Sequence, residues 1–194
     1  MPLELAAEIC AAYIRCMVLC SSRGRPPNAP AALIHPCQPI VAKQPPTGPG
    51  WAHELKHNGY RLQSHCATDG CGSTRSMAPT GRSANPLITE AAAKIDGSVI
   101  LDAEIVWLDL EGVPNFDALH SRVNDQNATA CTFDLLMLDG DDLRRNPYVE
   151  CKRALRKLLR HGRGIQYVEH AEGLATNYML PPANSAWRVS FQRS

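Results

Sequence analysis

The sequence has no cysteine pair spaced C-x-x-C and no second pair of ligands at the spacing of a zinc site. Its eight cysteines are scattered, which favours reduced thiols. No hydrophobic run is long enough to span a membrane. The apolar N-terminal stretch carries Glu4 and Glu8 where a targeting segment has Lys or Arg. We therefore expect a cytoplasmic chain that does not enter a membrane.

The sequence also lacks a strong excess of positive or negative charge. Twenty Lys and Arg residues stand against nineteen Asp and Glu residues, which gives a formal net charge of +1. The strongly basic balance that by itself indicates a nucleic-acid binder is absent, so any contact with DNA depends on local clusters. The 194 residues, of which 44% are hydrophobic and 20% charged, suit one globular domain.

Proline divides the chain into a lead-in and a folded part. Residues 21–50 hold more than half of the fifteen prolines, which excludes regular helix and predicts an extended, poorly ordered lead-in over residues 1–50. From Trp51 onward, strand-like runs dominate and helices flank them. The fold class is α+β, with antiparallel sheets and flanking helices.

The turns and helices of the folded part have local signals. Turn pairs occur at Asn58-Gly59, Glu111-Gly112 and Asp139-Gly140. Side chains alternate along a strand, so Asp102 and Glu104 should share one side of their hairpin. Strand-like runs are expected at 51–65, 98–116 and 128–140, one helix at 87–95, and a basic helix with a leucine face at about 148–160.

The segment from Glu54 to Arg61 (ELKHNGYR) holds the most informative chemistry. Lys56 lies on a strand beside a turn, with Glu54 two residues before it and Arg61 five residues after it. Such a lysine can present its amine to a phosphate while the arginine holds the anion. Taken alone the signal is weak, because a Glu-x-Lys pair on a strand is usually a solvated surface pair.

The run from about Gln38 to Gly173 resembles the adenylation domain of bacterial ATP-dependent DNA ligases of the end-joining type. PPTGPGWAHELKHNGYRLQ is similar to the entry to that domain with its K-x-D-G nucleophile motif, ILDAEIV to its L-D-G-E strand, and FDLLMLDGDDLR to a third segment. QYVEHAEG resembles the stretch before the next motif. The resemblance implies an incomplete ligase-type nucleotidyltransferase domain over residues 51–174, an aberrant tail over 175–194 and no OB-fold domain.

The same resemblance implies the role of each site residue. Lys56 would attack the α-phosphate of ATP to form lysyl-AMP, and the AMP would pass to a DNA 5′-phosphate before the 3′-hydroxyl seals the nick. Glu54 would read the adenine amino group, Arg61 contact the nucleotide, Phe133 stack on the base, and Glu104 bind the ribose or the metal, Mg²⁺ or Mn²⁺. Nicked double-stranded DNA is the implied partner, with end-joining proteins as further candidates. Without the family, Phe133 would be taken as a core residue and Glu104 as a solvated one.

The proposed nucleophile needs help from its surroundings. A free lysine has a pKa of about 10.4 and is protonated at neutral pH, so it must be desolvated or placed near other cations. Bound Mg²⁺ and an arginine would do this and would also neutralise the phosphate charge that builds during in-line attack.

Two residues depart from the family motifs. Asn58 stands where the nucleophile motif has Asp, which keeps the turn but removes a charge near the nucleophile. Ala103 stands where the strand motif has Gly, and Ala is strained there if the backbone needs a positive φ or a close approach.

Two longer segments depart from the family altogether. Residues 71–84 (CGSTRSMAPTGRSA) can be back-translated and read two nucleotides later. The shifted frame is compatible with the sequence RFYTINGADWTER, which resembles the sequence of the family at this point. Residues 180–194, read at the same offset, permit AACKLGLEGIVSKK. We therefore expect compensating frame shifts near residues 71 and 85, and a third between about 175 and 180. These would remove a lysine and a glutamate of the nucleotide pocket and the later Trp-x-Lys-x-Lys motif. The loss of the last lysines should abolish efficient self-adenylation.

Three other functions stay open. The chain could be a catalytically dead remnant that at most binds nucleotide weakly. The basic run 152–163 (KRALRKLLRHGR), with seven cations in twelve residues, could be a DNA-binding module, although such a helix is more often a solvated amphipathic one. RNA ligases and guanylyltransferases share the lysyl-nucleotide chemistry, but PPTGPGWAHE and FDLLMLDGDDLR favour a DNA ligase.

Overall fold

The structure is a computed structural model. It describes residues 12–15, 34, 39–42, 51–67, 70–76, 85–121, 127–159, 162–172 and 186–191. These residues fall into two compact units, which we treat separately. The first unit draws on Met1–Arg25, His35–Lys56 and Glu169–Arg193, and the second on Pro26–Ile34 and His57–Val168.

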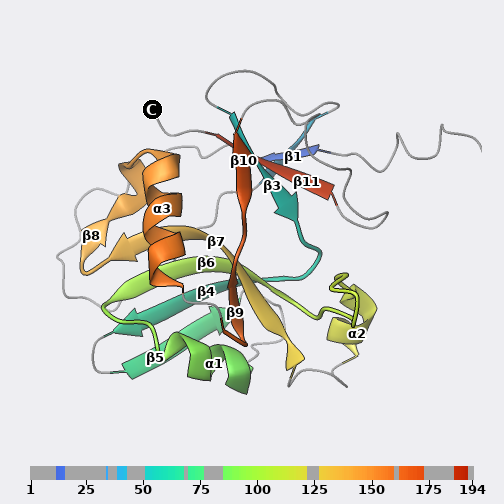
Figure 1. Ribbon diagram of the computed structural model, residues 1–194, viewed down its shortest axis with the longest axis horizontal. Coiled ribbons are helices and arrows are strands. Elements are labelled where there is room, and N and C mark those ends of the chain that lie inside the picture. The colour runs from blue at the N-terminus through green and yellow to red at the C-terminus, as the bar shows by residue number, and fades with distance from the viewer. Residues whose placement is uncertain are drawn as a thin grey trace, which may run out of the picture. The chain divides into compact units, whose positions relative to one another are not determined.

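The first unit is a five-stranded sheet in the order β10-β3-β11-β1-β2 (Figure 1). Within it β1 and β11 run parallel and every other pair is antiparallel. Segments expected to be lead-in and tail thus contribute strands to this sheet: β11, from the tail, pairs with β3, and β1 and β2, from the lead-in, follow β11 on the same side of β3. The bounds are β1 Ala12–Arg15, β2 Pro39–Ala42, β3 Trp51–Lys56, β10 His170–Glu172 and β11 Ala186–Phe191.

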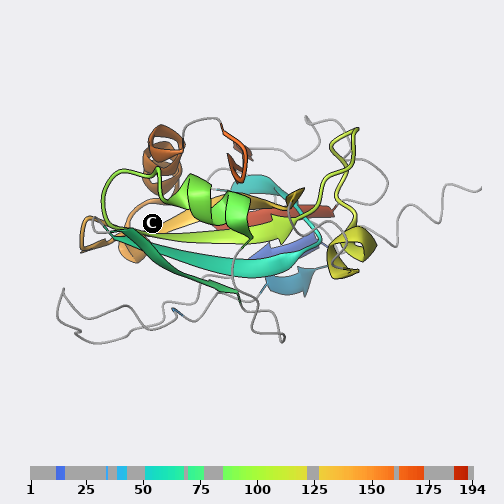
Figure 2. The same ribbon diagram turned by 90° about the horizontal axis from the view of Figure 1, so that it is seen from below.

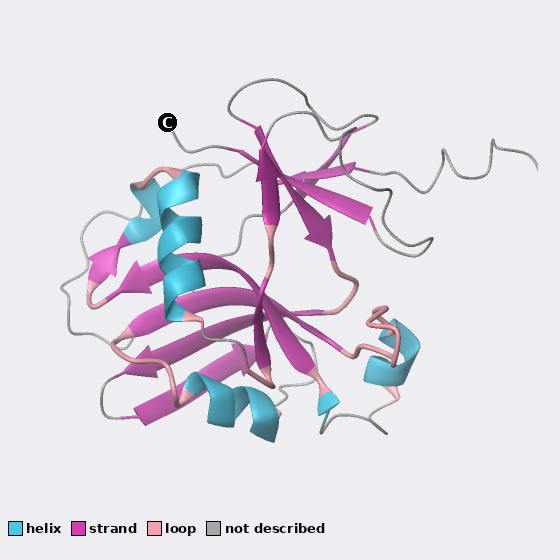
Figure 3. Cartoon of the chain, viewed as in Figure 1, coloured by secondary structure: helices cyan, strands magenta, loops and turns pink. Residues whose placement is uncertain are grey.

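The second unit is a six-stranded sheet in the order β5-β4-β6-β7-β8, with β9 added in parallel to β7 (Figures 1 and 3). All its other pairs are antiparallel. Its strands are β4 Tyr60–Ala67, β5 Gly70–Ser76, β6 Val99–Val106, β7 Thr129–Leu138, β8 Asp141–Asp142 and β9 Ile165–Tyr167. Its helices are α1 Pro86–Ala92, α2 Phe116–His120, the 3₁₀ turn η2 Leu143–Arg145 and α3 Tyr148–Leu158.

Alternation along the strands gives this six-stranded sheet two different faces. One face is apolar: Leu62, Leu101 and Ala103 pack there with Ile88 of α1 and Leu155 of α3. Figure 2 shows the green α1 and the orange α3 on the same side of the sheet. The opposite face carries polar side chains on β4 and β6, namely Arg61, Gln63, Asp102 and Glu104. The α+β class with flanking helices is confirmed.

The expected turns form, with one topological difference. Asp139 and Gly140, at φ of 49° and 93°, lead from β7 into β8, and Gly112 closes a small hairpin at φ of 79°. Asn58-Gly59, in contrast, does not join two paired strands. The strand before it, β3, belongs to the five-stranded sheet, whereas β4 belongs to the six-stranded one. The turn signal is local and does not decide which strands pair.

The helices begin and end close to their expected positions. Asn85 caps α1 by accepting the Leu87 N–H at 2.9 Å, and Pro86 occupies the first turn. The basic run forms α3, whose Leu155 is fully buried. Its first cation, Lys152, is also fully buried, so Lys152 is not available to phosphates in the alternative of a DNA-binding module over residues 152–163.

The cysteines behave differently from one another. Cys66 is disulfide-bonded, which corrects the expectation of reduced thiols throughout. Cys131 and Cys151 are buried thiols. In the described residues no helix has both the length and the apolar character needed to cross a membrane.

Candidate functional site

The expected nucleophile ends a strand of the first unit. Lys56 is the last residue of β3, and Glu54 lies two residues earlier on the same strand. Across the sheet Glu54 pairs with His170 of β10 on one side and with Arg188 of β11 on the other, while Lys56 pairs with Ala186. Only 1% of Glu54 is exposed, so its carboxylate is not a solvated surface group. This burial removes the simplest non-functional explanation of the Glu-x-Lys pair.

The turn after Lys56 is tied to β6 within the second unit. The Gly59 N–H donates to Oε1 of Glu104 at 2.9 Å. A Cβ built on Gly59 would lie only 2.0 Å from the backbone oxygen of Ile105, closer than any real contact. Glycine is therefore required at this position by a close approach of two backbones. Glu104, at 7% exposure, is a buried acceptor for this turn and not a solvated hairpin residue.

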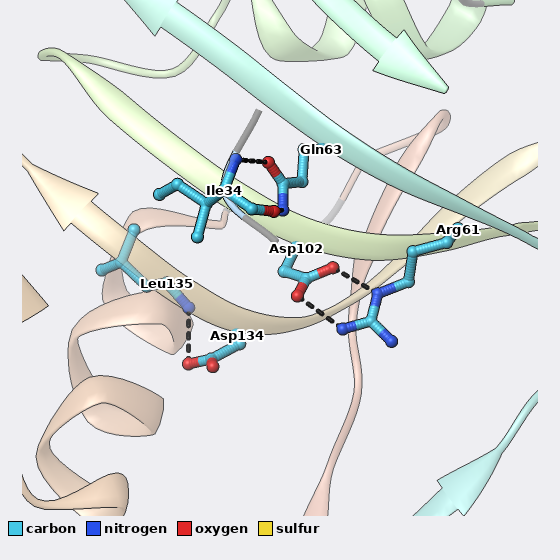
Figure 4. Close-up of polar contacts among 6 residues, drawn as sticks. All are labelled: Ile34, Arg61, Gln63, Asp102, Asp134 and Leu135. Carbon is cyan, nitrogen blue, oxygen red and sulfur yellow. Dashed lines mark hydrogen bonds and ion pairs between the residues drawn. The ribbon is translucent and has the colours of Figure 1, made fainter. Parts of the chain in front are cut away.

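Arg61 is held by a buried carboxylate on the neighbouring strand. Its Nε and Nη2 donate to the two oxygens of Asp102 at 2.6 and 2.7 Å, as Figure 4 shows. Asp102 is 1% exposed, and the guanidinium lies 4.8 Å above the ring centroid of Phe133. A two-bonded pair of this kind fixes the orientation of the guanidinium plane as well as its position. In the described part of the chain, no hydrogen bond from Nη1 is seen.

Phe133 occupies an irregular point of β7. Asp102 pairs with Asp134 and Ala103 with Thr132, so Phe133 is the extra residue of a β-bulge between them. Its side chain is 3% exposed and packs with Val106, Cys131 and Val168. A bulge turns a side chain out of the regular alternation, and here it brings the ring under the arginine.

Further polar residues extend this face of the sheet (Figure 4). The fully buried Gln63 binds both backbone groups of Ile34: its Oε1 accepts the N–H at 3.0 Å and its Nε2 donates to the carbonyl at 2.5 Å. Asp134, opposite Asp102, accepts the N–H of Leu135 at 3.0 Å and is 1% exposed. Among the side chains described on this face, the Arg61 guanidinium thus lies with several carboxylates in a buried setting.

The negative charge of Glu104 affects its cross-strand neighbour. Burial, together with the smaller effect of the nearby Glu104 carboxylate, raises the pKa of Cys131 to about 12. Cys131 is therefore a neutral thiol at physiological pH and has no role as a nucleophile.

The substitution of Ala for Gly at position 103 causes no backbone strain. Among the described residues, Asp139 is the only non-glycine residue with a positive φ, so Ala103 has ordinary strand geometry. Its methyl group is fully buried in the apolar core between the sheet and the helices. Ala103 is therefore compatible with the strand it occupies.

The structure brings Arg61 and Phe133 together and places Glu104 against the turn that follows Lys56. Sequence reasoning missed two residues that hold this group: Asp102 as the partner of Arg61, and Lys152 beneath β7. Helical spacing could have indicated Lys152, since it lies three residues before the buried Leu155. No group of three or more His, Cys, Asp or Glu side chains suited to a metal ion occurs in the described residues.

Comparisons with known proteins identify the family of the chain. The family model described as the ATP dependent DNA ligase domain matches residues 33–179. The chain is 34% identical over 130 residues to the multifunctional non-homologous end joining protein LigD of Pseudomonas aeruginosa, covering 63% of this chain and 15% of that protein. It is 29% identical over 140 residues to the bifunctional LigD of Bacillus subtilis, covering 63% and 23%.

Solved structures give the same family. The chain is similar to a mycobacterial DNA ligase D complexed with ATP and MES, with a TM-score of 0.53 and 28% identity, over 68% of this chain and 46% of that one. It also matches the ligase domain of LigD from Mycobacterium tuberculosis, with a TM-score of 0.50 and 30% identity, over 63% and 42%. The chain spans less than a quarter of the length of the curated relatives above and less than half of these solved chains. Since the family model covers most of its residues, the chain belongs to the ATP-dependent DNA ligase domain family.

Proposed function

We propose that this chain is the nucleotide-binding part of an ATP-dependent DNA ligase, with Lys56 as the adenylated nucleophile. The observation that carries the proposal is the buried group formed by Arg61, Asp102 and Phe133. A fixed guanidinium beside an aromatic ring offers an anion site and a stacking surface together, which are the two features a nucleotide presents. ATP is the ligand of a similar mycobacterial DNA ligase D, which supports the choice of nucleotide.

The chemical step would begin at the amine of Lys56. Its nitrogen loses a proton and attacks the α-phosphorus of ATP, a new N–P bond forms, and the bond to the bridging oxygen breaks to release pyrophosphate. A DNA 5′-phosphate oxygen then attacks the same phosphorus and frees the lysine. The 3′-hydroxyl of the nick finally attacks the 5′-phosphate, and AMP leaves.

The other site residues would bind and orient the nucleotide. Glu54 accepts from the adenine amino group, and Arg61 uses the part of its guanidinium not engaged by Asp102 to hold a phosphate. Phe133, whose ring lies beside the Arg61 guanidinium, would stack on the base. These assignments apply to the partial catalytic domain that we propose over residues 51–174.

For a divalent cation, Mg²⁺ or Mn²⁺, these residues offer the Glu104 carboxylate as a ligand, to be completed by phosphates of the nucleotide. Such ions are commonly held by one or two carboxylates together with substrate phosphates, so the lack of a protein-only cluster among the described residues does not conflict with its use. Glu104 would be its protein ligand, although one oxygen of that carboxylate already accepts the Gly59 N–H. The cation would neutralise charge on the phosphates during the attack.

The expected frame shifts bear directly on activity. Residues 77–84 and 173–185 lie outside the described residues. They include most of the residues that we expect to be encoded in a shifted reading frame. A version of the gene with the three shifts repaired would restore the lysines we expect to be missing. We propose nicked DNA as its substrate, end-joining proteins as partners and the cytoplasm as its location.

The test is an adenylation assay with α-labelled ATP and Mg²⁺, followed by denaturing electrophoresis. We expect a covalent, acid-labile label in the chain and none in Lys56→Ala or in the matched Lys56→Arg, which keeps the positive charge but not the amine nucleophile. Absence of label in the original chain, with label in the frame-repaired version, would identify the chain as an inactive remnant. Label that persists in Lys56→Ala would exclude Lys56 as the nucleophile.

A further inference from the structure

Lys152 is the most deeply buried charged side chain that the proposed chemistry does not use. It lies on α3 with 0% exposure, although this helix turns other cations, such as Arg153 and Lys157, to the surface. Its Nζ donates to the carbonyl oxygen of Val168 at 2.6 Å and to that of Phe133 at 3.2 Å. The burial of an ammonium group is costly, so these contacts must offset a large loss of hydration.

Aromatic rings complete the surroundings of this amine. Nζ lies 4.4 Å from the ring centroid of Tyr167 and 5.9 Å from that of Tyr148. The face of an aromatic ring attracts a cation, most strongly where water is excluded. The site is therefore built for a positive charge, and not merely for the length of the side chain.

The two carbonyls mark the point where regular pairing between β7 and β9 stops. The parallel ladder joins Ala130–Thr132 to Ile165–Tyr167, and the Val168 N–H donates to the carbonyl of Thr132 at 2.9 Å. The next carbonyl along β7 is that of Phe133, the extra residue of the bulge. Lys152 bridges this carbonyl and that of Val168 at the point where the backbone hydrogen bonds between β7 and β9 end.

We propose that Lys152 is a positioning residue that fixes the Phe133 bulge, and through it the ring that lies under Arg61. The inference rests on the proposed function, since the ring and the guanidinium are the groups assigned there to the nucleotide. Without the bridge, the bulge can relax toward regular alternation, which moves the Phe133 ring away from Arg61. Loss of Lys152 should therefore weaken nucleotide binding without touching the nucleophile.

The structural test compares Lys152→Met with Lys157→Met in the full chain. Both variants lose one cation from the same helix, but Lys157 is exposed. Amide hydrogen exchange measures local opening, and we expect it to be about tenfold faster around residues 131–135 in Lys152→Met than in Lys157→Met, with β4 and α1 little changed. Lys152→Arg, which keeps a cation and several donors, should restore the slow exchange.

If Lys152→Met does not fold, as judged by circular dichroism, the same comparison uses Lys152→Gln. This variant keeps an N–H donor for one carbonyl but loses the charge. Faster exchange confined to residues 131–135 supports the inference. Exchange equal to that of Lys157→Met, or raised evenly throughout the second unit, overturns it.

The functional test is the ATP dependence of adenylation, using the frame-repaired version if the original chain is not labelled. We expect Lys152→Met to raise the ATP concentration for half-maximal labelling about tenfold, while the rate at saturating ATP stays within about twofold. Equal loss at all ATP concentrations would contradict a positioning role. If neither version of the chain is labelled, the proposed function fails, while the exchange experiment still tests the bridge by Lys152.

Discussion

Arg61 and Asp102 face each other from neighbouring strands and share two hydrogen bonds of 2.6 and 2.7 Å. They are not direct cross-strand partners: Arg61 pairs in register with Glu104, and Gln63 pairs with Asp102. The arginine thus reaches diagonally past the carboxylate opposite it. The two carboxylates of β6 therefore have different partners. Asp102 binds the Arg61 guanidinium, and Glu104 accepts the Gly59 N–H.

The first prediction concerns this ion pair. Arg61→Met removes the cation bound to the buried Asp102 and should lower the free energy of unfolding by about 3 kcal/mol or more, because a buried charge loses its partner. The double variant Arg61→Met/Asp102→Leu should be closer to the original chain in stability. Urea denaturation of the two single variants and the double variant measures the coupling. Strictly additive effects would show that the pair contributes nothing beyond its separate side chains.

The second prediction concerns the turn after Lys56. Gly59→Ala puts a methyl group where the backbone oxygen of Ile105 already lies, so the turn must shift away from β6. We expect a loss of about 1–3 kcal/mol in the free energy of unfolding. Asn58→Ala is the matched control, since Asn58 is exposed and its replacement should change stability by no more than about 0.5 kcal/mol. Equal stability of the two variants in thermal melts would contradict the close approach.

The third prediction concerns Asn58, which replaces the Asp of the nucleophile motif. Asn58→Asp returns a carboxylate beside the turn that follows Lys56 and should increase adduct formation with ATP. A tenfold rise corresponds to about 1.4 kcal/mol of transition-state stabilisation, a reasonable size for one charge. Initial rates of labelling, measured on the frame-repaired version with and without the substitution, provide the check. An unchanged rate would show that the missing charge does not limit the reaction.

The fourth prediction concerns stability at alkaline pH. Burial, reinforced by Glu104, raises the pKa of Cys131 to about 12. In the unfolded chain the thiol ionises near pH 8.5, so above that pH the unfolded state binds fewer protons than the folded state. Stability should therefore be fully present below about pH 8.5 and fall as pH rises toward 12, by at most about 1.4 kcal/mol per pH unit from this thiol.

Replacement of Cys131 by Ala isolates this contribution. The variant should be less stable at neutral pH because of the lost side-chain volume, but its stability should fall less steeply between pH 9 and 11. Denaturant midpoints at several pH values, compared with those of the original chain, give the two slopes. Parallel slopes would mean that Cys131 ionises in the folded chain as easily as in the unfolded one.

Several features of this protein follow from the sequence alone. The Asp139-Gly140 turn, the cap and proline that start α1, and the leucine face of α3 all depend on a few adjacent residues. Such signals depend on backbone conformation and on the spacing of apolar residues, which act locally. The motif order likewise identifies the family, which the comparison over residues 33–179 confirms.

Other features were decided only by the tertiary structure. Asn58-Gly59 separates strands of two different sheets, Arg61 binds Asp102, and Glu104 holds Gly59. Lys152 is buried under β7 although its neighbours in sequence suggest an exposed basic helix. In each case the outcome depends on which distant strand lies alongside, and therefore on the pairing and burial of residues far apart in the chain, which no local pattern encodes.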